Sequence, residues 1–254
     1  MNRAKIHWLE GAGLPEDAMI LEAVPGVGNV GKILIDAVVE KHPSRTIGWI
    51  LHPDFPPHAT LSETGLIGPP RLDISKIVLP NGEELVTITG VMQPMTASGQ
   101  FEVAEAVLDL ADESGASRLL VLAGLASEPE QRSIFAVCSD KEIRKALETD
   151  DIEVSKDQPK AGMIGVAGMV LSLAPTKGVP AIGVIAETVG ASADILAAER
   201  MSRWIEQAFD ITLDLDLDTT KETAARLMER MGEEGSIDDY LRMDENEASS
   251  DFYV

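Results

Sequence analysis

The chain has 254 residues, an ordinary length for one α/β domain, and a formal net charge of −22 from 43 acidic and 21 basic residues. This charge disfavours nucleic acid and anionic membranes as partners, and it favours solubility or a basic partner surface. The N-terminus lacks the apolar core of a signal peptide, and the longest apolar stretch, 161–174, is too short to span a bilayer. The single cysteine, Cys138, excludes an internal disulfide. We therefore expect a cytoplasmic protein.

Short apolar runs typical of strands alternate along the chain with segments of helical spacing. In chain order the sequence predicts a strand at Ala18–Val24, a helix at Asn29–Glu40, strands at Arg45–Leu51, Leu72–Leu79 and Leu85–Thr89, a helix at Gly99–Ser114, a strand at Arg118–Ala123, an apolar run at Ile134–Cys138, helices at Asp140–Glu148 and Met163–Leu173, a strand at Val179–Ala186 and a helix at Ala191–Phe209. Asn81-Gly82 predicts a β-hairpin between the two strands that flank it. This order indicates an α/β fold with a mostly parallel sheet flanked by helices on both faces.

The second half of the chain has its own pattern. The segment Met163–Leu173 is apolar all round, which predicts a central helix covered on all sides, with Gly165 and Gly168 allowing close approach. Near the C-terminus, the alternation in Asp214–Asp218 predicts a linker or an edge strand. We expect an α/β core at 1–218, a C-terminal helical extension at 219–243 and a flexible acidic tail at 244–254. The helices of the extension are expected at Thr220–Met231 and Ile237–Met243.

A glycine-rich turn follows the first predicted strand. It fits G-x-G-x-x-G and opens a predicted helix, the context of a dinucleotide-binding fingerprint, in which backbone N–H groups approach a pyrophosphate. An acid that could bind ribose follows 23 residues after the last glycine. The residues of this candidate ligand site are Pro25, Gly26, Gly28, Asn29, Gly31 and Asp54.

Several features weaken the nucleotide interpretation. Pro25 restricts the backbone of Val24, where nucleotide-binding folds run smoothly off the strand. Asp54 lies past the end of its strand rather than at the tip, and no later segment offers a hydride-transfer site. The competing interpretation is a structural strand-to-helix turn in which glycine permits close helix packing.

The histidines and serines give no clear catalytic arrangement. His52, Asp54 and His58 are residue types that bind zinc or iron, but they lie on an extended proline-rich loop, and we interpret them as polar loop residues rather than a metal site. No G-x-S-x-G elbow is present, and Ser62 and Ser98 have no identifiable partner histidine. We predict no catalytic residue and no cofactor.

Several separated motifs resemble the proteasome assembly chaperone family found in archaea. They are the run Val24–Gly31, the segment Asp54–Pro57, the apolar helix Gly162–Leu173, the pair Glu187-Thr188, and Asp194 with Ala197-Ala198. The resemblance covers about residues 18 to 210. It implies a nucleoside-phosphorylase-like α/β core without the catalytic equipment, and an ATP-independent oligomer that helps to assemble proteasome rings.

The chain ends in Phe252, Tyr253 and Val254, after the acidic, small-residue run 243–251. This hydrophobic–Tyr–X ending resembles the docking motif of proteasome activators and assembly factors, which inserts between subunits of the proteasome ring. Capture of a C-terminal carboxylate is an established mode of peptide recognition. We predict a homo-oligomeric, non-enzymatic proteasome assembly chaperone or core-particle-binding factor. The alternatives are a nucleotide- or nucleoside-binding enzyme that uses the glycine turn, and a chaperone that binds unfolded clients without the tail.

Overall fold

The computed structural model describes residues 2–9, 11, 13–57, 59–61, 65–154, 162–190 and 192–215. In chain order the elements are β1 (Lys5–Trp8), β2 (Met19–Ala23), the 3₁₀ turn η1 (Val27–Asn29), α1 (Val30–Lys41), β3 (Ser44–Leu51), β4 (Thr60–Leu61), β5 (Ile67–Gly68), β6 (Leu72–Val78), β7 (Glu84–Gly90), α2 (Ala97–Glu113), β8 (Arg118–Ala126), β9 (Ile134–Cys138), α3 (Lys141–Thr149), α4 (Gly165–Lys177), β10 (Ala181–Thr188) and α5 (Ile195–Phe209).

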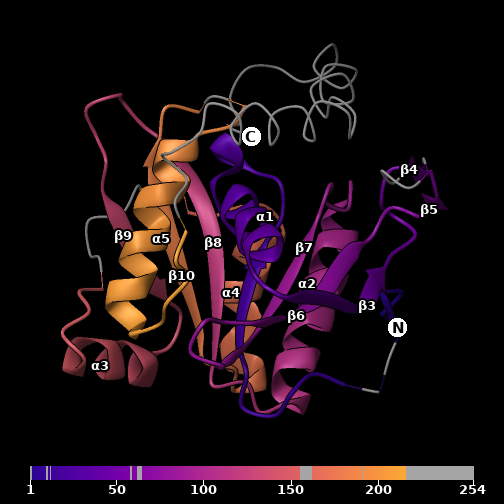
Figure 1. Cartoon of the computed structure of the whole chain (residues 1–254), viewed down its shortest axis with the longest axis horizontal. Helices are drawn as coiled ribbons and strands as arrows, with labels where there is room; N and C mark the ends of the chain where they lie inside the picture. The colour runs from indigo at the N-terminus through magenta and orange to yellow at the C-terminus, as the bar shows by residue number, and fades with distance from the viewer. Residues whose placement is uncertain are drawn as a thin grey trace.

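One sheet runs through the described part of the chain, with strand order β1-β3-β6-β7-β2-β8-β10-β9 (Figure 1). The four central strands β7, β2, β8 and β10 run parallel, whereas the pairings on both flanks are antiparallel. The α/β fold with a helix-flanked sheet is thus confirmed, and its parallel part is the centre. The flanks are antiparallel because β6 and β7 form a hairpin and because β9 returns against β10.

Helices cover both faces of this sheet. Side chains of α1 and α5 form one hydrophobic core with one face of the central strands, and side chains of α2 and α4 form the other core (Figure 1). Strand β2 shows how a single element serves both layers, because its side chains alternate between faces. Leu21 belongs to the α1–α5 core, and Ile20 belongs to the α2–α4 core; both are fully buried.

The predicted hairpin is confirmed, with β6 and β7 paired from Leu72↔Gly90 to Val78↔Glu84. Gly82 adopts φ +86°, which a glycine accommodates without strain. The other strands and helices predicted up to Phe209 are also present, with ends shifted by a few residues. Strands β1, β4 and β5 were not expected.

The expectation that the Met163–Leu173 segment is covered on all sides is wrong. Helix α4 begins at Gly165 and lies beside α2 on one face of the sheet, so Val166 and Val170 are buried while Ser172 and Thr176 on its outer side are exposed. This amphipathicity is not evident from the sequence, because the exposed positions of α4 carry small or weakly polar residues. Gly165 does allow the expected close approach, because a Cβ there would lie 2.7 Å from Gln93 Oε1; at Gly168 the tight contact, 2.4 Å to the Met163 carbonyl oxygen, lies within the segment itself.

No helix in the described residues is both long and apolar enough to cross a bilayer. The expected helical extension at 219–243 and the expected tail at 244–254 lie outside the described residues. The last described segment is tied to the core, because the Leu213 carbonyl lies 2.6 Å from His42 Nε2 at the end of α1.

Candidate functional site

The glycine turn lies where β2 leaves the sheet and α1 begins. Gly28 and Asn29 both have left-handed backbone conformations, with φ of +64° and +48°. The turn closes on itself, because the Asn29 N–H donates to the Gly26 carbonyl at 2.9 Å and the Gly26 N–H donates to Asn29 Oδ1 at 3.2 Å. Asn29 is therefore a turn residue whose side chain is committed to the backbone.

The loop after β10 holds the outside of this turn. Asn29 Nδ2 donates to the Ser192 carbonyl at 2.8 Å, and the Asp194 N–H donates to the Gly28 carbonyl at 2.9 Å. Asp194 also caps α5 by accepting from the Ala197 N–H, and its second oxygen accepts from Thr188 Oγ1 at 2.7 Å. Sequence reasoning noted Thr188 and Asp194 within the family resemblance, but it did not place them against the glycines.

The glycines of the turn are required by packing. A Cβ on Gly28 would lie 2.6 Å from Thr188 Oγ1, and a Cβ on Gly31 would lie 2.6 Å from the Leu122 carbonyl oxygen. Gly124 on β8 complements them, since a Cβ there would lie 2.0 Å from the Val27 carbonyl oxygen. These contacts explain Gly28 and Gly31 without any ligand, which favours the structural interpretation of the motif over the nucleotide interpretation.

Asp54 lies far from the glycine turn. In the dinucleotide fold the ribose-binding acid follows the strand next to the glycine-bearing strand. Here β3, which precedes Asp54, is three strand spacings from β2, a separation of roughly 14 Å at about 4.8 Å per spacing. The spacing of 23 residues in sequence therefore does not bring Asp54 to the turn.

The Asp54 carboxylate is instead part of an ionic network at the N-terminus of α2. Arg3 binds it through both terminal nitrogens, at 2.9 and 2.8 Å, and Thr96 Oγ1 also donates to it. These hydrogen bonds, that from Arg3 foremost, hold the pKa of Asp54 below its usual range. The network joins the start of the chain, the loop after β3 and the cap of α2. It was not predictable, because its members are about 50 residues apart.

Glu102 forms the second half of this network. Its Oε2 accepts from the Arg3 backbone N–H at 2.7 Å and lies 3.0 Å from His52 Nε2. Because the Asp54 N–H donates to His52 Nδ1, the imidazole proton is assigned to Nε2, which donates to Glu102. The bond from His52 and those from Arg3 lower the pKa of Glu102 to about 2.

Within the described residues, no group of three or more His, Cys, Asp and Glu side chains could hold a metal ion. His52 and Asp54 are engaged in the ionic network just described. His58, the third residue of that candidate group, lies outside the described residues.

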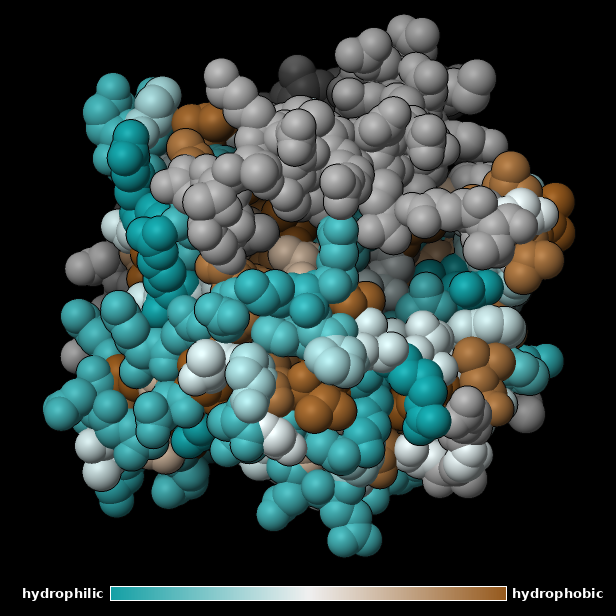
Figure 2. Space-filling view, in the orientation of Figure 1, coloured by the Kyte–Doolittle hydropathy of each residue, from teal (hydrophilic) through white to brown (hydrophobic). Residues whose placement is uncertain are grey.

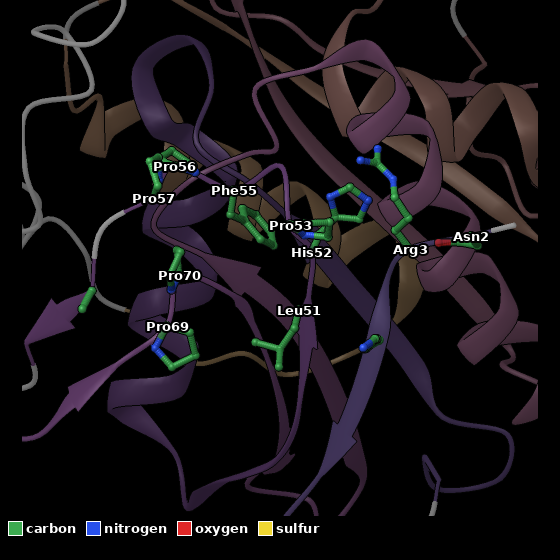
Figure 3. Close-up of a pocket in the computed structure, with 12 residues that line it drawn as sticks. Asn2, Arg3, Leu51, His52, Pro53, Phe55, Pro56, Pro57, Pro69 and Pro70 are labelled. Carbon is green, nitrogen blue, oxygen red and sulfur yellow. The ribbon is translucent and has the colours of Figure 1, made fainter.

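An open pocket of about 810 Å³ lies beside this network, at the end of β3 (Figure 3). Its walls are mainly apolar, and in Figure 3 Asn2 and Arg3 lie on the side opposite Pro56, Pro57, Pro69 and Pro70. We call it the proline pocket; its lining residues are Asn2, Arg3, Lys5, Leu51, His52, Pro53, Phe55, Pro56, Pro57, Ala59, Pro69 and Pro70. The sequence marked His52, His58 and the segment Asp54–Pro57 as notable but did not reveal the pocket, because its walls come from three separate segments.

A second feature missed from the sequence is the buried carboxyl group of Glu22. It lies on β2 between Ile88 and Val121, within the α2–α4 layer, and is fully buried. Neither carboxyl oxygen has a hydrogen-bond partner among the described residues. Burial raises its pKa to about 8, so the group is mostly protonated at neutral pH.

The predicted docking residues Phe252, Tyr253 and Val254 lie outside the described residues. The described chain ends at Leu215, next to the end of α1, where Lys41 Nζ and Asp214 Oδ2 lie 3.5 Å apart. Thirty-nine residues follow Leu215 in the sequence, and Phe252, Tyr253 and Val254 are the last of them.

The structure is thus an α/β protein in which the glycines of the turn allow close packing of α1 against the sheet. The ionizable side chains of the network at the start of α2 pair with one another. The chain belongs to the PAC2 family, whose profile matches residues 20–234. It is similar to an uncharacterized protein of Methanocaldococcus jannaschii, with 27% identity over 186 residues, covering 72% of this chain and 70% of the relative.

Solved structures share the fold at lower sequence identity. Pyrococcus furiosus PbaA, described as an archaeal homolog of proteasome-assembly chaperone, has a TM-score of 0.71 and 20% identity, with 90% of this chain and 94% of PbaA covered. Pyrococcus furiosus PbaB, described as an archaeal proteasome activator, has a TM-score of 0.73 and 20% identity, with 96% of this chain and all of PbaB covered. The resemblance to the assembly-chaperone family is thus confirmed.

Proposed function

We propose that this protein is a proteasome assembly chaperone or core-particle-binding factor that docks through its C-terminal Phe252-Tyr253-Val254. The observation that carries the proposal is the fold shared with PbaA and PbaB over nearly the whole chain. The hydrophobic–Tyr–X ending supports it independently, because it lies outside the segment on which the family match rests.

Each docking residue has a distinct role in this proposal. Tyr253 packs in a pocket between ring subunits and hydrogen-bonds there, and Phe252 adds apolar contact. The Val254 carboxylate pairs with a basic group of the pocket, as in other cases of C-terminal capture. The acidic run 243–251 keeps the ending solvated and steers it toward a basic rim.

In this proposal the protein acts as a homo-oligomer. One three-residue ending buries little surface, whereas several endings joined by one body gain by effective concentration, in general about 10²–10⁴-fold. A ring of repeated subunits offers repeated pockets, so a symmetric oligomer can engage several at once.

We also propose that the protein is non-enzymatic, cytoplasmic and independent of ATP. The packing role of Gly28 and Gly31 supports this, because the turn needs no phosphate to explain its glycines. The nucleoside-phosphorylase-like character of the core remains a prediction; the parallel centre of the sheet is consistent with it.

The proposal is tested by a pull-down from native cell extract. The full-length chain is expected to recover proteasome subunits, and a chain ending at Asp251 is not. Thermal stability of the shortened chain should match that of the full chain, because the deletion leaves every residue of the packed core described above in place. Equal recovery by both chains would contradict tail docking.

A further inference from the structure

The turn between β6 and β7 presents an asparagine followed by a glycine at the surface. Asn81, Gly82 and Glu83 are all exposed, and a Cβ on Gly82 would lie more than 4 Å from any atom outside its chain neighbours. The turn lies at the lower end of the sheet in Figure 1, where β7 starts and where β9 leads into α3. The surface at this end is mainly hydrophilic in Figure 2. Water therefore reaches both the side chain of Asn81 and the backbone of Gly82.

The hydrogen bonds of this turn act on two groups that can react with each other, the Asn81 side-chain amide and the Gly82 backbone nitrogen. The Glu83 N–H donates to Asn81 Oδ1 at 3.0 Å, so it polarises the side-chain carbonyl and stabilises the negative charge that develops on Oδ1 when Cγ is attacked. The Gly82 N–H donates to the Leu79 carbonyl at 2.9 Å, and this bond must break before the nitrogen can act as a nucleophile. Such local opening costs little free energy at an exposed hairpin turn.

Among the described residues, Asn81 is the asparagine that is followed by glycine. A glycine nitrogen has no Cβ beside it to hinder its approach to Cγ. Asn29 is followed by the β-branched Val30, and both polar atoms of its amide are hydrogen-bonded within the glycine turn. Asn2 is followed by the bulky Arg3, and both polar atoms of its amide are hydrogen-bonded as well. The sequence and the hydrogen bonds therefore single out Asn81.

We propose that Asn81 is a site of spontaneous covalent modification, at which water converts the asparagine to aspartate and isoaspartate. The Gly82 nitrogen loses its proton to solvent and attacks Asn81 Cγ; the N–Cγ bond forms, the Cγ–Nδ2 bond breaks, and the leaving nitrogen takes a proton from solvent and departs as ammonia. Water then opens the cyclic imide at one of its two carbonyls. Opening at Cγ gives aspartate, and opening at the main-chain carbonyl gives isoaspartate, in which the backbone runs through Cγ. Water is the only co-reactant, nothing is oxidised or reduced, and each conversion adds one negative charge.

The test is peptide mass spectrometry of the folded full-length protein after incubation for several weeks at about pH 8.5 and about 37 °C. The peptide that contains Asn81 should gain the mass difference between –NH₂ and –OH, at a rate that rises with pH because the nucleophile is the deprotonated nitrogen. Anion exchange should resolve a species with one further negative charge, and a protein isoaspartyl methyltransferase should methylate that species. The peptides that contain Asn2 and Asn29 serve as internal controls and should change at least tenfold more slowly.

Asn81→Gln is the matched variant, because it keeps the amide but would have to close a larger ring, so its conversion should be at least tenfold slower. The position is exposed, so the variant should fold, which circular dichroism checks. An unchanged Asn81 in the folded protein, over a period in which the urea-unfolded chain is converted, overturns the inference, because the native turn would then protect the residue. Conversion of Asn2 or Asn29 at the same rate also overturns it, and so does an Asn81→Gln variant that is converted as fast as wild type.

Discussion

Replacing Gly31 with alanine should destabilise the protein, although alanine is the better helix former. A Cβ at this position would lie 2.6 Å from the Leu122 carbonyl oxygen, 2.7 Å from Leu122 Cβ and 2.9 Å from Ala23 Cβ. Helix α1 must therefore move away from β8 and β2. Overpacking of this kind costs about 1–3 kcal/mol, and three contacts under 3.0 Å, one of them with backbone, place the cost in the upper part of that range, at about 2–3 kcal/mol. Alanine recovers at most about 1 kcal/mol by helix propensity, so we expect a net loss of at least about 1–2 kcal/mol.

Gly26→Ala is the matched control within the same motif. A Cβ there would meet only the Val24 carbonyl oxygen, at 3.9 Å, and the backbone of Gly26 is extended, with φ −163°. Its stability should stay close to that of wild type. Urea unfolding followed by circular dichroism compares the free energies of unfolding of the three proteins. In a thermal melt, a loss of 1 kcal/mol corresponds to about 2–4 °C, so the melting temperature of Gly31→Ala should fall by about 2–8 °C. Equal stability of Gly31→Ala and wild type would refute the packing account of the motif.

Three further predictions follow from the described residues. Calorimetry with NAD, NADP, ATP, AMP and nucleosides should show no binding tighter than millimolar, and micromolar affinity that Gly28→Val abolishes would support the enzyme alternative instead. The pKa of Glu22 is raised from 4.5 to about 8, so between these pH values the folded chain holds a proton that the unfolded chain loses. This group therefore lowers the free energy of unfolding as the pH rises from about 4.5 to about 8. Glu22→Gln should gain stability relative to wild type across that window, and a constant difference in urea titrations at pH 5 to 8 would contradict this. The pKa of Glu102 is lowered to about 2, so its carboxylate should contribute stability above about pH 4.5 that disappears as the pH falls toward 2. Glu102→Gln should therefore be less stable than wild type at pH 7, and the two free energies of unfolding should converge in acid. A deficit independent of pH would indicate a packing effect instead.

Local signals predicted most of the elements but not their arrangement. Asn81-Gly82 and the apolar runs beside it specify the β6–β7 hairpin, because a hairpin depends on residues close in sequence. Strand β1 was missed because Lys5–Trp8 is short and half polar, and it gains its pairing only from β3, about 40 residues later. The antiparallel flanks depend on such distant pairings, which periodicity does not reveal.

The same limit applies to the candidate site. Gly26–Gly31 was recognisable as a strand-to-helix turn, but its close packing depends on Thr188 and Leu122, which are remote in sequence. Arg3 binds Asp54 across 51 residues, so nothing near Asp54 in the sequence indicates that its carboxylate is already paired. Glu22 lay inside a correctly predicted strand, yet nothing local distinguished a buried carboxyl from one at an exposed edge.

Co-sedimentation with purified proteasome core particles at fixed salt tests the central claim most directly. Tyr253→Ala removes a rigid aromatic anchor and should weaken each docked tail by roughly 2 kcal/mol or more. One residue appended after Val254 displaces the carboxylate and should be nearly as damaging. Wild type should therefore sediment with the particle, and both variants should remain largely in the supernatant. Equal binding by all three proteins would contradict docking through Phe252-Tyr253-Val254.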